Sequence, residues 1–190
     1  MITETRAKEW TDEKLMALPN DGHKYELVEG KLVMSPAGYE HGDISVALVI
    51  ALGDYVRRHR LGRVADSSTG FKMLNGNVLS PDVSFVANER FHGMRSLPEG
   101  FFQGAPDLAV EVLSPGDRKT HLDRKLKDYF INGTRLAWVI NPKKQSVLLH
   151  RGVAPHKLLS VRDTLEGEEV VLGFAMAVSD LFSPFPWANE

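Results

Sequence analysis

A carboxylate lies inside the most apolar strand-like segment of the chain. Residues 107–113 read Asp-Leu-Ala-Val-Glu-Val-Leu, a pattern typical of a central strand that is buried on both faces of a sheet. The charged form of Glu111 in such a strand costs several kcal/mol unless a partner compensates it. A divalent cation is the usual partner, because its charge reverses the desolvation penalty. A salt bridge at the end of the sheet is the alternative interpretation.

A second carboxylate begins another expected strand. Asp82 follows Pro81 and starts the run over residues 82–86, so it should lie at a strand start. If the two strands are neighbours, Asp82 and Glu111 can share one cation. Hard cations such as Mg²⁺ prefer oxygen ligands and retain several waters. The pair therefore predicts a Mg²⁺ site in which Mn²⁺ would substitute, although a Pro-Asp dipeptide alone usually indicates a turn.

A lysine borders the apolar stripe of the helix expected over residues 117–131. Lys125 lies three residues after Leu122 and four before Tyr129. Its stem could pack along apolar surface while its ammonium stays in water, which is the ordinary behaviour of such a lysine. It could instead lean over the sheet toward the carboxylates, where a positive charge stabilises the negative charge that develops on a phosphate.

The remaining pattern predicts one α/β domain over residues 1–190, with a mixed sheet. Helices are expected over 12–18, with Thr11 as the cap, and over 42–58, and a final helical turn over 178–182. Strands are expected over 25–28, 31–34, 63–65, 69–74, 135–140, 146–150, 157–161 and 168–172. The strands of residues 157–172 should add to the sheet edge rather than build a second domain.

Composition excludes several classes of protein. The chain has 190 residues, a formal net charge of −2 and no cysteine, which excludes a disulfide scaffold, a thiolate zinc site and a cysteine nucleophile. The longest apolar run, residues 46–52, is too short to span a membrane, and residues 1–20 lack a secretory apolar core. We therefore expect a cytoplasmic protein without membrane contact. A local excess of Lys and Arg in residues 112–160 permits, but does not require, a phosphate-facing surface.

A set of motifs makes the chain resemble a known superfamily. The chain is similar to the PD-(D/E)XK nucleases, and within them to the Uma-two family of putative restriction endonucleases. The resemblance covers about residues 23–150 and rests on residues 25–32, 35–36, His41, 80–83, 106–115, Lys125 and Tyr129.

The resemblance implies a fold and a set of site residues. The fold would be a restriction-endonuclease-like core in the order αβββαβ over about residues 23–150, with edge strands and a tail in residues 151–190. The catalytic, metal-binding acid pair would be Asp82 and Glu111. Glu29 would be the upstream acid, acting as a secondary ligand of the metal or the water. His41 would contact a phosphate or orient a carboxylate, unless it is a helix-start histidine without a function.

One position departs from the superfamily motif. The motif places a lysine two residues after the glutamate, and here that position is Leu113. In this branch the lysine is thought to have moved to the following helix, which indicates Lys125 as the catalytic cation. If the lysine has not moved, the protein could bind metal and DNA yet cleave poorly.

The preferred interpretation is a Mg²⁺-dependent endonuclease that hydrolyses DNA. Basic residues of 57–63 and 118–127 would contact phosphates, and a homodimer is expected by analogy alone. The alternative is a non-cleaving nucleic-acid-binding or regulatory module that retains the fold. A purely structural interaction domain would show no metal affinity and would leave Glu111 unexplained.

Overall fold

The computed structural model describes residues 10–19, 24–34 and 38–182. Within these ranges the α-helices are α1 (Asp12–Met16), α2 (Tyr39–His59) and α3 (Lys119–Ile131), joined by the short 3-10 segments η1 (Asn88–Phe91), η2 (Pro142–Lys144) and η3 (Val178–Phe182). The Thr11 hydroxyl accepts the Lys14 backbone N–H at 3.4 Å, which confirms the predicted cap of α1. The motif residues 35–36 lie outside the described residues.

The larger sheet has six strands. In spatial order they are β11 (Pro155–Ser160), β10 (Ser146–His150), β9 (Leu136–Asn141), β8 (Leu108–Val112), β6 (Val83–Ala87) and β3 (Gly62–Asp66). The central strands β8 and β9 are parallel, and the other neighbours are antiparallel. Every residue of β8 is buried, as the apolar run predicts.

A second sheet has five short strands. In spatial order they are β2 (Lys31–Met34), β1 (Tyr25–Val28), β5 (Val78–Leu79), β4 (Phe71–Lys72) and β7 (Phe102–Gln103). Two hairpins belong to this sheet: β1 pairs with β2, and β4 pairs with β5 around the turn at Asn75-Gly76. A single central sheet was expected, so the second sheet corrects that expectation. The fold is a mixed α/β fold with two mixed sheets.

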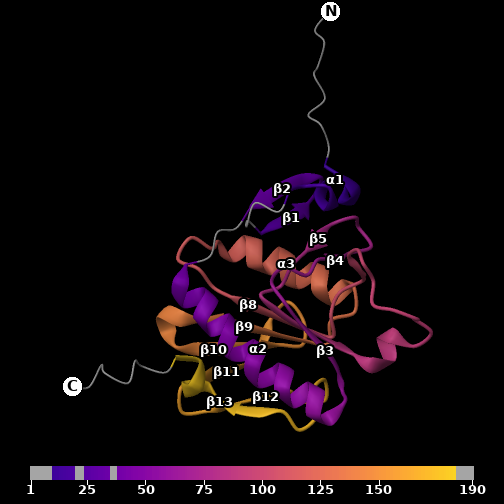
Figure 1. The fold of residues 1–190 in the computed structure, drawn as a ribbon. Helices are drawn as coiled ribbons and strands as arrows, with labels where there is room; N and C mark the ends of the chain where they lie inside the picture. The colour runs from indigo at the N-terminus through magenta and orange to yellow at the C-terminus, as the bar shows by residue number, and fades with distance from the viewer. Residues whose placement is uncertain (1–9, 20–23, 35–37, 183–190) are drawn as a thin grey trace, which may run out of the picture.

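Helices cover both faces of the six-stranded sheet (Figure 1). Alternate side chains of β8 point to opposite faces, so Val110 and Val112 pack in the cluster that contains Leu48 and Leu52 of α2. Ala109 packs on the other face, in the cluster that contains Leu126 of α3 and several apolar side chains of the five-stranded sheet, among them Phe71. Glu111 alternates with Val110 and Val112, so its side chain points toward α3.

The C-terminal segment differs from the expected strand pairing. The strand pair there is β12 (Thr164–Glu166) with β13 (Ala175–Ala177), and residues 168–172 form turns instead of a strand. The N–H groups of Val170 and Val171 both donate to the Gly167 carbonyl, at 3.0 and 2.8 Å. The apolar run is therefore bent into a tight turn that buries both valines. As predicted, β11 extends the edge of the larger sheet through β10.

In the described part of the chain, no helix is both long and apolar enough to cross a membrane.

Candidate active site

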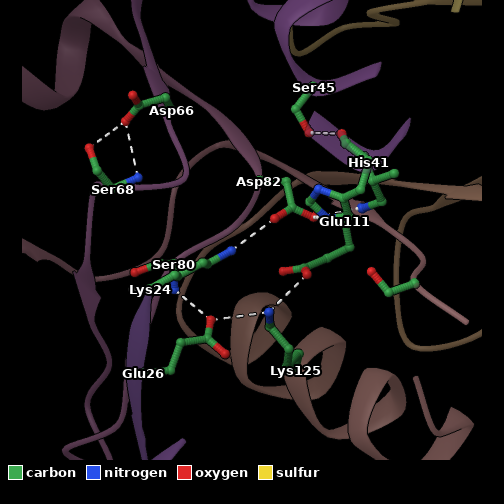
Figure 2. A network of polar contacts seen from close by, with 12 residues as sticks. Lys24, Glu26, His41, Ser45, Asp66, Ser68, Ser80, Asp82, Glu111 and Lys125 are labelled. Carbon is green, nitrogen blue, oxygen red and sulfur yellow. Dashed lines mark hydrogen bonds and ion pairs between the residues drawn. The ribbon is translucent and has the colours of Figure 1, made fainter. Parts of the chain in front are cut away.

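A cleft of about 1000 Å³ lies where the first turn of α2, the start of α3 and the strands β1, β6 and β8 meet. Its lining includes three acids, two lysines and a histidine whose side chains are joined by ion pairs or hydrogen bonds: Glu26, Asp82, Glu111, Lys24, Lys125 and His41. Figure 2 shows these six side chains pointing toward one another from elements that are far apart in the sequence. The cleft therefore contains the predicted residues Asp82, Glu111, Lys125 and His41.

Two side chains of α3 hold the carboxylate of Glu111. The Tyr129 hydroxyl donates to Oε1 at 2.7 Å, and the Lys125 ammonium donates to Oε2 at 2.8 Å. Burial raises the pKa of Glu111, and the nearby charge of Asp82 adds to this effect, while the charge of Lys125 opposes it. Glu111 is thus the acid of the pair that takes up a proton more readily.

Asp82 has a different set of partners. Its Oδ1 accepts the Lys24 ammonium at 2.8 Å, and its Oδ2 accepts both His41 Nε2 at 3.0 Å and the Val112 backbone N–H at 2.8 Å. Burial alone would raise the pKa of Asp82, but the hydrogen bond from His41 and the charge of Lys24 outweigh it and hold the pKa well below its usual range. Asp82 therefore stays ionised.

Backbone pairing brings the two acids together. Asp82 immediately precedes β6, which pairs with β8, and its own N–H donates to the Val110 carbonyl at 2.9 Å. Its carboxylate reaches the backbone next to Glu111. The condition that the two strands are neighbours is therefore met by β6 and β8, with Asp82 directly before β6.

Lys125 joins two acids rather than one. Its ammonium lies 2.8 Å from Glu111 Oε2 and 3.1 Å from Glu26 Oε1. Burial opposes its charge, but the charges of Glu111 and Glu26 outweigh burial and raise the pKa of Lys125. The side chain is only 15% exposed, so the ammonium is a fixed positive charge inside the cleft and does not extend into bulk water.

The upstream acid of the cleft is Glu26, not Glu29. Glu29 stands at the hairpin turn with a φ of 51°, and its side chain is 64% exposed beside Arg124. The turn carries Glu29 outside the cleft, into a separate cavity that Arg124 and Asp128 also line. Glu26 is buried in β1, and its Oε1 accepts the Ser80 backbone N–H at 2.8 Å.

Sequence reasoning missed Glu26 and Lys24 as members of the cleft, and it missed the contact of Tyr129 with Glu111. Glu26 carries the same signal as Glu111, a carboxylate inside a strand-like apolar run. Tyr129 lies four residues after Lys125, a spacing that puts both on one helix face. Lys24 has no signal in its local sequence, because its contact with Asp82 joins residues 58 positions apart.

The basic residues divide into two groups. Arg118 and His121 at the start of α3 line the cleft, whereas Arg124 and Lys127 line a separate cavity. Arg57 and Arg58 lie in the last turn of α2, whereas His41 lies in its first turn. At 1.5 Å per residue the two ends are roughly 25 Å apart. The expected phosphate contact of residues 57–63 is therefore not part of this cleft.

No group of three or more His, Asp or Glu side chains is arranged to hold a metal ion in the described ranges. The carboxylates of the cleft instead take their hydrogen bonds from lysines, a histidine, a tyrosine and backbone N–H groups. Their donor types are nevertheless those that hard cations prefer, since Asp82, Glu111 and Glu26 offer carboxylate oxygens.

Comparison with known proteins assigns the chain to a family. The model of the Uma2 family, described as a putative restriction endonuclease, matches residues 12–179. The chain belongs to this family.

A solved structure has a similar fold. The crystal structure of a putative nuclease belonging to DUF820 from Anabaena variabilis superposes with a TM-score of 0.79 at 22% sequence identity. The match covers 92% of this chain and 98% of that one. No curated protein sequence matches the chain significantly.

Proposed function

We propose that the protein is a Mg²⁺-dependent endonuclease that hydrolyses DNA phosphodiester bonds. The observation that carries the proposal is the contact of Lys125 with Glu111 in the cleft that also contains Asp82. Lys125 supplies from α3 the positive charge that the superfamily's lysine would supply from the position that Leu113 occupies here. Family membership supports the same class of activity.

The order of elements also supports the proposal. The larger sheet and its helices follow the chain as α2, β3, β6, β8, α3 and β9. This is the αβββαβ order that the nuclease resemblance implies. The strands β10 and β11 then extend the sheet beyond this core.

The cleft fits a hard divalent cation by donor type. Asp82 and Glu111 would hold it, and Glu26 would be the third oxygen donor nearby. When bound, such a cation supplies positive charge that polarises the scissile phosphate and lowers the pKa of water. The low pKa of Asp82 keeps that carboxylate ionised and able to bind.

The side chains of the protein perform the remaining work. Lys125 holds a positive charge at a fixed position, where it stabilises the negative charge that grows on the phosphoryl oxygens. Tyr129 fixes the rotamer of Glu111 by donating to Oε1, and His41 fixes Asp82 in the same way. Arg118, at the rim, would contact the backbone of DNA and position it without reading its sequence.

Cleavage of supercoiled plasmid tests the proposal. With Mg²⁺ or Mn²⁺ we expect nicking by the wild type, loss of nicking in Glu111→Gln, and roughly a hundredfold lower rate in Lys125→Met, the scale of losing one transition-state donor. Lys127→Met is the matched control, because Lys127 is exposed on the same helix. Equal rates in Lys125→Met and the wild type would contradict the role of Lys125.

A second function is favoured by one observation. The ammonium groups of Lys24 and Lys125 already engage Asp82 and Glu111, and the motif lysine is replaced by Leu113. A non-cleaving DNA-binding module would have such a neutralised cleft. It predicts salt-dependent binding of duplex DNA that Arg118→Ala weakens, with no nicking in any divalent cation.

A further inference from the structure

Lys24 is the member of the cleft for which the proposed chemistry has no role. It precedes β1, and its ammonium lies 2.8 Å from Asp82 Oδ1. Figure 2 shows it approaching Asp82 from the five-stranded side of the cleft, opposite His41. Within the described residues, the ion pair of Lys24 is with Asp82, whereas Lys125 lies between Glu111 and Glu26.

Lys24 occupies the side of Asp82 that a metal would need. The other oxygen, Oδ2, already accepts His41 and the Val112 N–H, so Oδ1 is the oxygen with the fewest other donors. A divalent cation binds a carboxylate oxygen at about 2.1 Å. An ammonium on the same oxygen repels that cation, and the two positive charges compete for one ligand.

The two lysines differ in how easily they can leave. Lys125 extends from the rigid helix α3 and is held by two carboxylates. Lys24 is held by one carboxylate, its side chain is 18% exposed, and it lines the open cleft. Its four-carbon stem lets the ammonium turn toward water without moving the backbone.

We propose that Lys24 is the counter-ion of Asp82 that a divalent cation displaces, and that the released ammonium then binds a phosphate of the DNA. The inference rests on the proposed nuclease function. Metal binding and DNA binding are then cooperative, because the Lys24 ammonium that the metal displaces from Asp82 pairs with a phosphate of the DNA. While Lys24 pairs with Asp82, a metal ion must first displace that ammonium, so metal binding alone gains little.

Metal affinity measured by titration calorimetry with Mn²⁺ tests the displacement without any cleavage assay. Lys24→Met should bind Mn²⁺ about tenfold more tightly than the wild type, a typical size for coupled binding. Lys24→Arg keeps the competing charge and should bind like the wild type. Lys31→Met removes the same charge from an exposed site on the neighbouring strand and should also bind like the wild type.

The second arm measures the phosphate contact. In the presence of Ca²⁺, Lys24→Met should bind a short DNA duplex more weakly than the wild type, and the addition of Ca²⁺ should strengthen DNA binding less in the variant. Circular dichroism and thermal unfolding would verify that each variant is folded.

The outcomes separate the two proposals. If Lys24→Met is folded and binds Mn²⁺ no more tightly than the wild type, the displacement is wrong even if the nuclease function holds. If Mn²⁺ binds neither variant nor wild type, or binds Asp82→Asn as well as the wild type, the metal site of the proposed function fails first. An equal increase in Mn²⁺ affinity in Lys31→Met would show a general effect of removing a positive charge and would also overturn the role of Lys24.

Discussion

A single substitution can test the hydrogen bond that Tyr129 donates to Glu111. Tyr129→Phe deletes the hydroxyl that donates to Glu111 Oε1 at 2.7 Å and leaves the buried ring in place. A hydrogen bond to a charged acceptor contributes about 2 kcal/mol, so we expect the free energy of unfolding in urea at pH 7 to fall by about that amount. The cleavage rate should also fall, because Glu111 loses one of its two side-chain donors.

Phe130→Leu, a neighbouring change that removes no hydrogen bond, provides the comparison. A Tyr129→Phe variant as stable as the wild type would show that water replaces the hydroxyl at Glu111.

A buried histidine makes stability depend on pH. His150 in β10 is buried, its Nδ1–H donates to the Val153 carbonyl at 3.1 Å, and its Nε2 has no partner in the described part of the chain. Burial lowers the pKa of His150 below its ordinary value of 6.5. The unfolded chain therefore takes up the proton first as the pH falls. The contribution of neutral His150 to the free energy of unfolding has its full value above about pH 6.5 and decreases below it.

Urea unfolding at pH 7.5 and pH 5.5 measures this dependence. The wild type should lose more stability between the two values than His150→Gln, which does not titrate. An identical loss in both proteins would show that other groups cause the pH dependence.

At the scale of elements, α3 contacts structure on two sides. Lys125 and Tyr129 donate hydrogen bonds to Glu111, whereas Asp128 accepts the side-chain amides of Asn75 at 3.1 Å and Asn77 at 2.7 Å. Asn77 in turn accepts the Glu29 backbone N–H at 2.8 Å through its Oδ1. The helix is therefore joined to both hairpins of the five-stranded sheet through one buried carboxylate.

Asp128→Ala should weaken this junction. The change leaves the buried amide of Asn77 and the exposed amide of Asn75 without their acceptor, so we expect a loss of about 2 kcal/mol in unfolding free energy, most of it from Asn77. Amide hydrogen exchange at Met73 and Asn77 should accelerate, because the hairpin loses its link to α3. Lys127→Ala, exposed on the adjacent position, should change neither quantity, and protection of the hairpin that survives in Asp128→Ala would contradict the role of Asp128.

At the scale of the whole molecule, the C-terminal segment packs in the same cluster as α2 and the larger sheet. Leu165, Val171, Phe174, Val178 and Leu181 all belong to that cluster. The Phe174 ring stacks on Trp138 of β9 with centroids 5.9 Å apart and meets Tyr55 of α2 edge-on at 5.6 Å. If residues 1–190 form one domain, as predicted, this segment should unfold together with the larger sheet.

Phe174→Ala tests that prediction. Removal of a buried phenylalanine costs about 3–5 kcal/mol, and this loss should lower the stability of the whole chain in one transition. Circular dichroism and tryptophan fluorescence should report the same midpoint. Two separate transitions, or a C-terminal unit that limited proteolysis releases in folded form, would divide the chain into two domains.

Local patterns were sufficient for the main elements and for part of the site. The apolar run around Glu111 predicted a buried strand, and β8 is buried throughout. The stripe of Leu122, Leu126 and Tyr129 placed Lys125 at the border of the buried helix face, and its ammonium contacts Glu111. Periodicity alone determines such features, because a side chain's direction on a strand or a helix follows from its position.

Tertiary structure decided which acid and which second lysine complete the cleft. Glu26 and Glu29 lie on one hairpin, and the sequence resemblance favoured Glu29. The choice depends on where β1 packs, since Glu26 is held by the Ser80 N–H from 54 residues away. Lys24 reaches Asp82 across a similar distance in sequence. The contact of Glu26 forms when β1 pairs with β5, and the contact of Lys24 forms when the five-stranded sheet meets the larger sheet. No local pattern of polar and apolar residues determines how such separate segments pack.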